Sequence, residues 1–239
     1  MGKTEMKKSF FLSMVTSASL FLLISNETVY ALSYPYPPTS PVTIDQMIRF
    51  KDGPGNTAGG EFEVYDSITG EHLFNSFCLE INEYLNFRDP FTVGGISTYA
   101  TNGGTGGQSG GMDSIDPRTA YLYHNFYWHT LDPYDYTGTG RDSSANALQR
   151  AIWYFEGENG GQWNDYTQLA DNAVNLYRTW SGLGDVRVIN LLNKDKKPSQ
   201  DQLTVVPVPE PATLLLLGSG VIGLFAFGKR RSWKLPLMK

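Results

Sequence analysis

The stretch Gly60-Glu61-Phe62-Glu63-Val64-Tyr65 (GEFEVY) alternates acidic and apolar residues. Successive side chains of a strand point to opposite faces, so Phe62 and Val64 share one face while Glu61 and Glu63 share the other. This pattern predicts a half-buried strand of an antiparallel sheet, with its acidic face toward solvent.

Short runs rich in β-branched and aromatic residues lie on either side of this strand, separated by glycine, proline and aspartate. Strands are predicted at residues 47–50, 61–65, 73–79, 91–93 and 186–192. The hydrophobic period then changes, and helices are predicted at 119–128, 145–156 and 162–180. The order predicts an α+β fold, an antiparallel β-sandwich or barrel-like lobe with a helical insert.

The predicted helix at 145–156 has signals at both of its ends. Asp142, Ser143 and Ser144 offer an N-cap. Gly157 and Gly160 provide a stop after the last apolar residue. These signals place the helix between a turn-rich connection and a glycine-containing loop.

The N-terminal 31 residues have the three zones of a secretory signal peptide. Lys3, Lys7 and Lys8 precede an apolar run at 10–24, and Val29-Tyr30-Ala31 supplies a cleavage site. Residues 1–31 are therefore predicted to direct export.

The other end of the chain carries an apolar run at 212–227 that is closed by a basic cluster. Such a segment is typical of a transmembrane helix whose cationic end stays on the cytoplasmic side. Residues 194–207 are charged and contain proline, so they are predicted to be a linker to this helix.

Residues 208–231 resemble the PEP-CTERM sorting signal, and residues 232–239 form a short tail beyond it. The resemblance implies processing by exosortase, a membrane transpeptidase-like enzyme of Gram-negative bacteria that make exopolysaccharide. It also implies membrane anchoring and then display at the cell surface or in the extracellular matrix. The residues that carry the resemblance are Pro209, Glu210, Pro211, Lys229, Arg230 and Arg231.

Composition excludes several classes of protein for the part between the two ends. The net charge of −5 and the lack of a basic run there argue against a nucleic-acid partner. A single cysteine excludes an intrachain disulfide framework. About 175 residues are enough for one domain with its own core.

Two short motifs point to chemistry. Phe77-Cys78-Leu79-Glu80 holds the only cysteine in a strand-like run, and residues 148–153 read LQRAIW. A spacing of four puts Gln149 and Trp153 side by side on one helix face. Gln149 is thus predicted at the rim of the core, with an indole over it.

Together the motifs resemble the thioester domains of bacterial surface adhesins, and also other PEP-CTERM proteins that contain both patterns. The resemblance makes residues 32–193 a thioester-like extracellular domain. It implies a bond between the side chains of Cys78 and Gln149, needing no cofactor and reacting once rather than in enzymatic turnover. The partner would be an extracellular amine or hydroxyl, on exopolysaccharide or on a surface protein. The residues expected to shield the bond are Phe77, Leu148, Ile152, Trp153 and Tyr154.

Other interpretations stay open at this point. Cys78 is also explained as a buried core thiol, Gln149 as a surface glutamine, and a bond between them as purely stabilising. An aromatic set could stack on sugars in a passive matrix protein, but we interpret it as filling a core otherwise poor in aliphatic residues; it includes Tyr121, Tyr123, Tyr127, Trp128, Tyr134 and Tyr136. A polysaccharide hydrolase needs two suitably spaced carboxylates. We interpret the available pairs, Glu80 with Glu83 and Glu156 with Glu158, as solvated acids.

A metal site is not predicted. The three histidines lack the spacing of known zinc motifs. The aspartates that could contribute to a calcium site lack the EF-hand register; they are Asp113, Asp116, Asp132, Asp135 and Asp142.

Overall fold

The computed structural model describes residues 40–56, 59–101 and 111–207. These residues belong to one compact unit that begins at Thr39. The predicted signal peptide, the sorting residues and the tail lie outside the described residues.

Six antiparallel strands form the main sheet, in the order β3-β2-β1-β4-β7-β8. They are β1 (Met47–Asn56), β2 (Gly59–Asp66), β3 (His72–Ser76), β4 (Phe91–Ser97), β7 (Val186–Leu192) and β8 (Pro198–Val205). A small second sheet pairs β5 (Tyr99–Ala100) with β6 (Asp113–Ser114).

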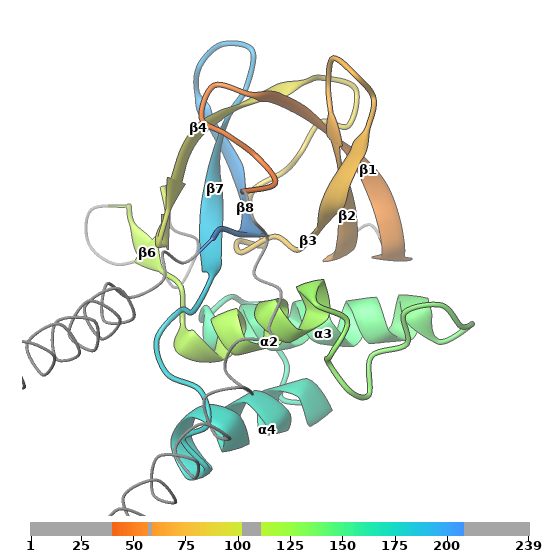
Figure 1. Ribbon diagram of the computed structural model, residues 1–239, viewed down its shortest axis with the longest axis vertical. Helices are drawn as coiled ribbons and strands as arrows, with labels where there is room; N and C mark the ends of the chain where they lie inside the picture. The colour runs from red at the N-terminus through yellow and green to blue at the C-terminus, as the bar shows by residue number, and fades with distance from the viewer. Residues whose placement is uncertain (1–39, 57–58, 102–110, 208–239) are drawn as a thin grey trace, which may run out of the picture. The chain divides into compact units, whose positions relative to one another are not determined.

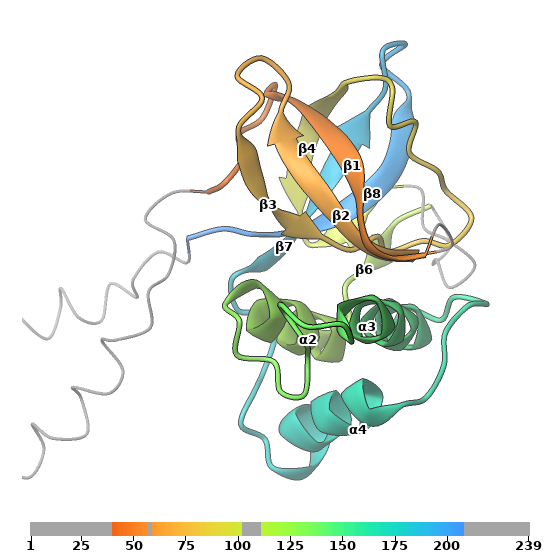
Figure 2. The same cartoon turned by 90° about the vertical axis from the view of Figure 1, so that its right-hand side faces the viewer.

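The helices follow β6 and precede β7, so they are an insert in the part of the chain that joins β4 to β7, two strands that are neighbours in the main sheet. They are α2 (Pro117–Tyr127), α3 (Arg141–Phe155) and α4 (Asp165–Asp171), the last continuing into a π-helical turn, η2 (Asn172–Leu176). Figures 1 and 2 show α2 and α3 across one end of the curled sheet, with α4 packed on their far side. The β-rich α+β lobe with a helical insert is confirmed.

The two edge strands of the sheet meet through the segment that follows β3. Leu203 of β8 donates its backbone N–H to the Phe77 carbonyl at 3.1 Å, and Ser76 Oγ donates to the Leu203 carbonyl at 2.7 Å. Cys78 forms an isolated bridge with Gln202. The only cysteine therefore lies where the curled sheet closes.

The interpretation of residues 194–207 as a linker is wrong for most of that range. Pro198–Val205 is strand β8, and its residues from Gln200 to Val205 are buried. Buried hydrogen bonds satisfy the polar groups that made the segment look solvated. Asp201, for example, accepts from the backbone N–H groups of Thr101 and Leu191.

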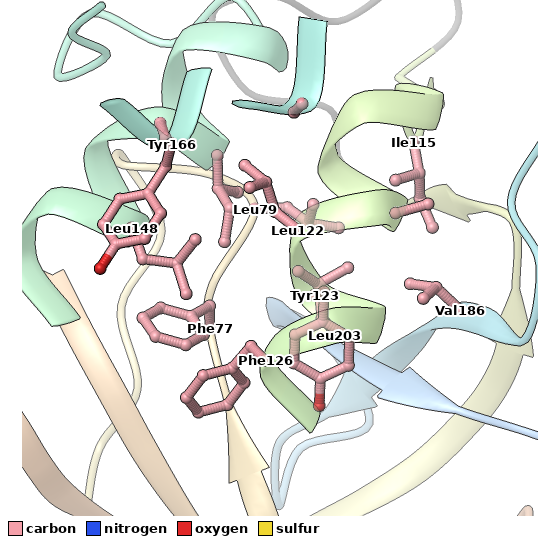
Figure 3. Close-up of a cluster of buried hydrophobic side chains, with 14 of the residues drawn as sticks. Phe77, Leu79, Ile115, Leu122, Tyr123, Phe126, Leu148, Tyr166, Val186 and Leu203 are labelled. Carbon is pink, nitrogen blue, oxygen red and sulfur yellow. The ribbon is translucent and has the colours of Figure 1, made fainter. Parts of the chain in front are cut away.

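Two apolar cores stabilise the fold. One fills the inside of the curled sheet and contains Ile48, Phe50, Val64, Val93, Ile189 and Leu191. The other lies between the open end of the sheet and the helices, where Figure 3 shows Phe77, Leu122, Tyr123, Phe126, Leu148 and Leu203 converging. Tyr123 and Tyr134 are buried in it, which confirms a core role for part of the aromatic set.

The predicted helix boundaries need correction. Helix α3 begins at Arg141 with Gly140 as its N-cap, so the residues predicted to cap it, from Asp142 on, form its first turn. Asn164 starts α4 with a capping box, and regular helix ends at Asp171. The π-helical turn then ends at Leu176, short of the predicted 180.

The acidic face predicted for β2 is not solvated at Glu61, which is 1% exposed. Its carboxylate accepts two hydrogen bonds from Arg141 at 2.9 and 2.7 Å, and others from Asn75 and Tyr134. Because a buried carboxylate needs a paired charge, this cluster joins β2 to the start of α3.

Candidate functional site

Gln149 and Cys78 are in contact although they lie 71 positions apart in the chain. Each residue is 1% exposed. The Cys78 thiol donates to Gln149 Oε1 at 3.4 Å, and Gln149 Nε2 donates to the Cys78 carbonyl at 2.8 Å. The two bonds hold the amide plane of Gln149 against the cysteine.

This arrangement brings the sulfur close to the amide carbon of Gln149. The carbonyl bond is about 1.2 Å long, so Sγ lies within roughly 4.6 Å of that carbon. Reacting atoms in a near-attack geometry are about 3 to 3.5 Å apart. A small side-chain movement would bring the two atoms into that range.

Burial raises the pKa of the Cys78 thiol well above its usual value, and the nearby Glu80 adds to the effect. The Trp153 indole N–H has the opposite, pKa-lowering influence on the same sulfur. Cys78 is therefore a protonated thiol in the folded chain. Any reaction that uses it must move that proton to another atom.

Helix α3 carries Gln149 and Trp153 one turn apart, and β2 begins directly against them. A Cβ atom on Gly59 would lie 2.6 Å from Gln149 Cγ and 2.7 Å from Trp153 Cη2. Gly59 also has a backbone φ of +154°. Glycine is required here for both reasons. The glycine allows the backbone at the start of β2 to pack directly against the side chains of Gln149 and Trp153.

Replacing Gly59 with alanine is expected to lower the free energy of unfolding by about 1 to 3 kcal/mol through overpacking and backbone strain. Denaturant-induced unfolding measures the change. Gly182→Ala is the matched control, because Gly182 has a φ of +64° but no atom within 4 Å of its Cβ position. Equal losses in both variants would show that backbone strain alone, and not contact with the pair, explains the effect.

Cavities flank the pair on two sides. A cavity of about 420 Å³ is lined by Cys78 and Trp153 together with Phe62, Glu83, Tyr84 and Phe87, among others. A second cavity, of about 240 Å³, is lined by Gln149 and Trp153 together with polar side chains of α3 and the loop after it. Gly59, Ile81 and Trp153 border both cavities and separate them.

The predicted shielding residues have different surroundings. Leu148, Ile152 and Phe77 are fully buried in the core between sheet and helices, and Figure 3 shows the first and last of these there. Trp153 is 5% exposed and contacts the pair from the cavity side. Tyr154 is 43% exposed, packs against Trp163 and is not among the described residues that line either cavity, so its shielding role stays a prediction.

The interpretation of the glutamates as solvated acids is wrong for three of them. Glu80, Glu156 and Glu158 are at most 8% exposed. Glu156 accepts from the backbone N–H of Asp116, and burial raises its pKa to about 8. This contact joins the C-terminal end of α3 to the N-terminal end of α2.

Glu80 differs because its Oε2 is buried and has no hydrogen-bond partner among the described residues. Burial, together with Asp201, Glu83 and Glu158, raises its pKa to about 9. The folded chain therefore keeps Glu80 protonated near neutral pH. An unfolded chain, with a pKa near 4.5, releases that proton.

Because the folded state holds the extra proton, the contribution of Glu80 to stability is greatest at low pH and is lost as pH rises from about 4.5 to 9. Glu80→Gln is expected to remove this slope and to raise the free energy of unfolding at pH 8 by on the order of 3 kcal/mol. Thermal unfolding from pH 5 to pH 9 tests it. The exposed Glu71→Gln serves as control; parallel pH profiles for all three chains would contradict the assignment.

The described residues contain no group of three or more histidine, cysteine or acidic side chains placed to hold a metal ion. Three of the five aspartates considered for calcium bind other groups of the protein. Asp135 accepts from the backbone N–H groups of Gly138 and Gly140, and Asp142 accepts from that of Gly55. Asp116 pairs with Arg118.

Residues that the sequence did not mark also build the site. Gln202 of β8 bridges Cys78, and Gln200 donates to the backbone carbonyls of Glu80 and Glu83. The Gly59-Gly60 pair was the one available signal, since glycine in a strand often marks a close approach of another segment.

Comparison with known proteins finds the PEP-CTERM protein-sorting motif at residues 207–231. No curated protein and no solved structure matches the chain. The predicted sorting signal is thus confirmed. The motif implies an exported, membrane-anchored protein that exosortase processes.

Among the described residues, no helix has the length and apolar character needed to span a bilayer. The segment predicted to span the membrane, at 212–227, is outside them.

Proposed function

We propose that this exported protein forms an internal thioester between Cys78 and Gln149 and uses it to attach covalently to an extracellular nucleophile. The observation that carries the proposal is the buried contact between the thiol and the amide, with Sγ 3.4 Å from Oε1 and Nε2 2.8 Å from the Cys78 carbonyl. A thiol that only fills the core does not need a glutamine amide whose oxygen and nitrogen are both hydrogen-bonded to the cysteine.

The forming step is a condensation. The sulfur attacks the Gln149 amide carbon, the carbon–nitrogen bond breaks, and the thiol proton leaves with the nitrogen as ammonia. Because the proton passes to the leaving group, no free thiolate has to persist in the apolar site. The fold supplies the positioning that makes the step intramolecular.

The attaching step exchanges one acyl bond for another. A partner amine or hydroxyl adds to the acyl carbon, its proton passes to sulfur, and the Cys78 thiol is released while Gln149 stays bonded to the partner. Burial of both residues keeps bulk water from the bond until a partner enters. Each molecule reacts once, and no cofactor takes part.

Intact-mass measurement of the purified chain tests the bond. We expect the mass to be lower by one ammonia and no thiol to be titratable after unfolding in acid. Cys78→Ala and Gln149→Ala should each restore the full expected mass. A mass deficit that persists in either variant would rule out this pair.

Methylamine separates the functions that such a chain could have. An attachment function predicts a methylamide on Gln149 and one new thiol. A bond that is present but inert to methylamine indicates a stabilising cross-link, and an absent bond leaves a non-covalent matrix protein. A polysaccharide hydrolase would release sugar from a polymer, which the thioester does not.

A further inference from the structure

The two cavities beside the pair differ in which residue of the pair lines them. The cavity of about 240 Å³ is lined by Gln149 and not by Cys78, whereas the cavity of about 420 Å³ is lined by Cys78 and not by Gln149. In the proposed thioester the acyl carbon belongs to Gln149. A nucleophile therefore approaches it from the smaller cavity.

The polar lining of the smaller cavity consists of amide side chains and one arginine. Its polar side chains besides Gln149 are Asn56, Asn146, Arg150, Asn159 and Gln162. An amide both donates and accepts hydrogen bonds, as a hydroxyl group does. An ammonium group only donates, and a carboxylate is the partner that best compensates its charge.

Charge in the smaller cavity opposes a cation. Arg150 is exposed at its edge, where Nη1 donates to Gln162 Oε1 at 2.8 Å. Among the described residues, no aspartate or glutamate lines it. Glu158 is buried and accepts from the backbone N–H of Ile81, which borders the cavity. Glu83 lines the larger cavity, which Cys78 also lines.

From this difference we infer, on the basis of the proposed function, that the natural partner is a neutral carbohydrate whose hydroxyl attacks through the amide-lined cavity. The product is an ester between Gln149 and the sugar oxygen. The hydroxyl proton passes to the Cys78 sulfur, and the carbon–sulfur bond breaks, so atoms and charge balance. Burial favours the protonated form of that sulfur and so suits it to accept the proton.

The cavity also limits how much of the partner enters. Its volume is below the roughly 300 to 1,000 Å³ of sites that enclose drug-sized ligands. It suits one sugar ring, with the Trp153 indole as one wall. We therefore expect a terminal or exposed sugar unit of a longer chain to react.

A competition experiment on the full chain tests this inference. The thioester-bearing protein is incubated with equal concentrations of maltotriose and Nα-acetyl-lysine amide, and a small free thioester is treated identically. Intact mass and peptide mapping then give the ratio of sugar ester to lysine amide on Gln149. We expect that ratio to exceed the ratio for the free thioester by about tenfold or more. A tenfold preference for the sugar corresponds to a difference of about 1.4 kcal/mol between the two reactions.

A charge reversal provides the internal check. Arg150→Glu should shift the ratio toward the lysine adduct by about fivefold, because an ammonium then meets a carboxylate at the cavity edge. Arg49→Glu makes the same change in net charge. Arg49 lies seven residues along β1 from Asn56, roughly 20 Å away, and should leave the ratio unchanged.

The outcomes separate the two proposals. A mass deficit of one ammonia together with a lysine adduct that dominates as in the free thioester overturns the carbohydrate inference alone. A thioester that yields neither adduct overturns it as well. No mass deficit at all overturns the thioester and the inference with it.

Discussion

Arg141→Ala is expected to lower the free energy of unfolding by about 3 to 5 kcal/mol, because it leaves the Glu61 carboxylate buried without a compensating charge. Glu61 has a fully buried side chain, and Arg141 supplies two of its hydrogen bonds. Equilibrium unfolding in urea measures the loss.

The control for this prediction is an arginine in a more exposed pair. Arg118 binds Asp116 at 2.7 Å, but side-chain exposures of 29% and 21% leave both charges hydrated. Arg118→Ala should therefore cost about 1 kcal/mol. A double variant, Glu61→Gln with Arg141→Met, should be more stable than Arg141→Ala alone. If Arg141→Ala were no more harmful than Arg118→Ala, Glu61 would not depend on its partner.

A double-mutant cycle on Cys78 and Gln149, with the free energy of unfolding as the readout, should show strong coupling between the two residues. By the chain-entropy estimate, closing a loop of 71 residues stabilises a fold by about 4 kcal/mol. Either Cys78→Ala or Gln149→Ala removes the whole cross-link, so the double variant should be only slightly less stable than each single one. The expected coupling energy is thus about 4 kcal/mol.

The same double-mutant cycle on neighbouring residues that are not cross-linked gives the coupling energy expected from ordinary contacts alone. Leu148 and Phe77 share the core on the same two segments, and ordinary contacts couple by about 0.5 to 3 kcal/mol. Losses from Cys78→Ala and Gln149→Ala that simply add would mean that no covalent link exists in the native chain.

Local patterns in the sequence predicted the elements that depend on local physics. The alternation of Phe62 and Val64 placed β2, and the periodicity around Leu148 and Ile152 placed α3. The same alternation misplaced Glu61, because the residue that makes its burial tolerable lies 80 positions away. A pattern within one strand holds no information about such a partner.

Strand β8 was missed for a related reason. Asp201, Gln202 and Thr204 are polar in sequence yet fully buried in the sheet. Their burial depends on distant groups, such as the Asn190 amide that donates to Asp201 at 3.0 Å. Composition alone therefore favoured a linker where the sheet needs its closing strand.

The candidate pair was predicted more fully than its surroundings. Helical spacing placed Trp153 beside Gln149, and the resemblance joined Gln149 to Cys78. The closeness of Gly59, the two cavities and the contacts of β8 depend on how the sheet meets α3. The interface between the sheet and α3 is formed by packing between segments that are distant in the sequence, and no single motif specifies it.

The position of β8 has a mechanical consequence. It lies between β7 and the segment that holds Cys78, and the sorting motif begins at residue 207, two residues after its end. Tension from an anchored C-terminus enters the fold along this strand and loads its flanking hydrogen bonds together, in shear.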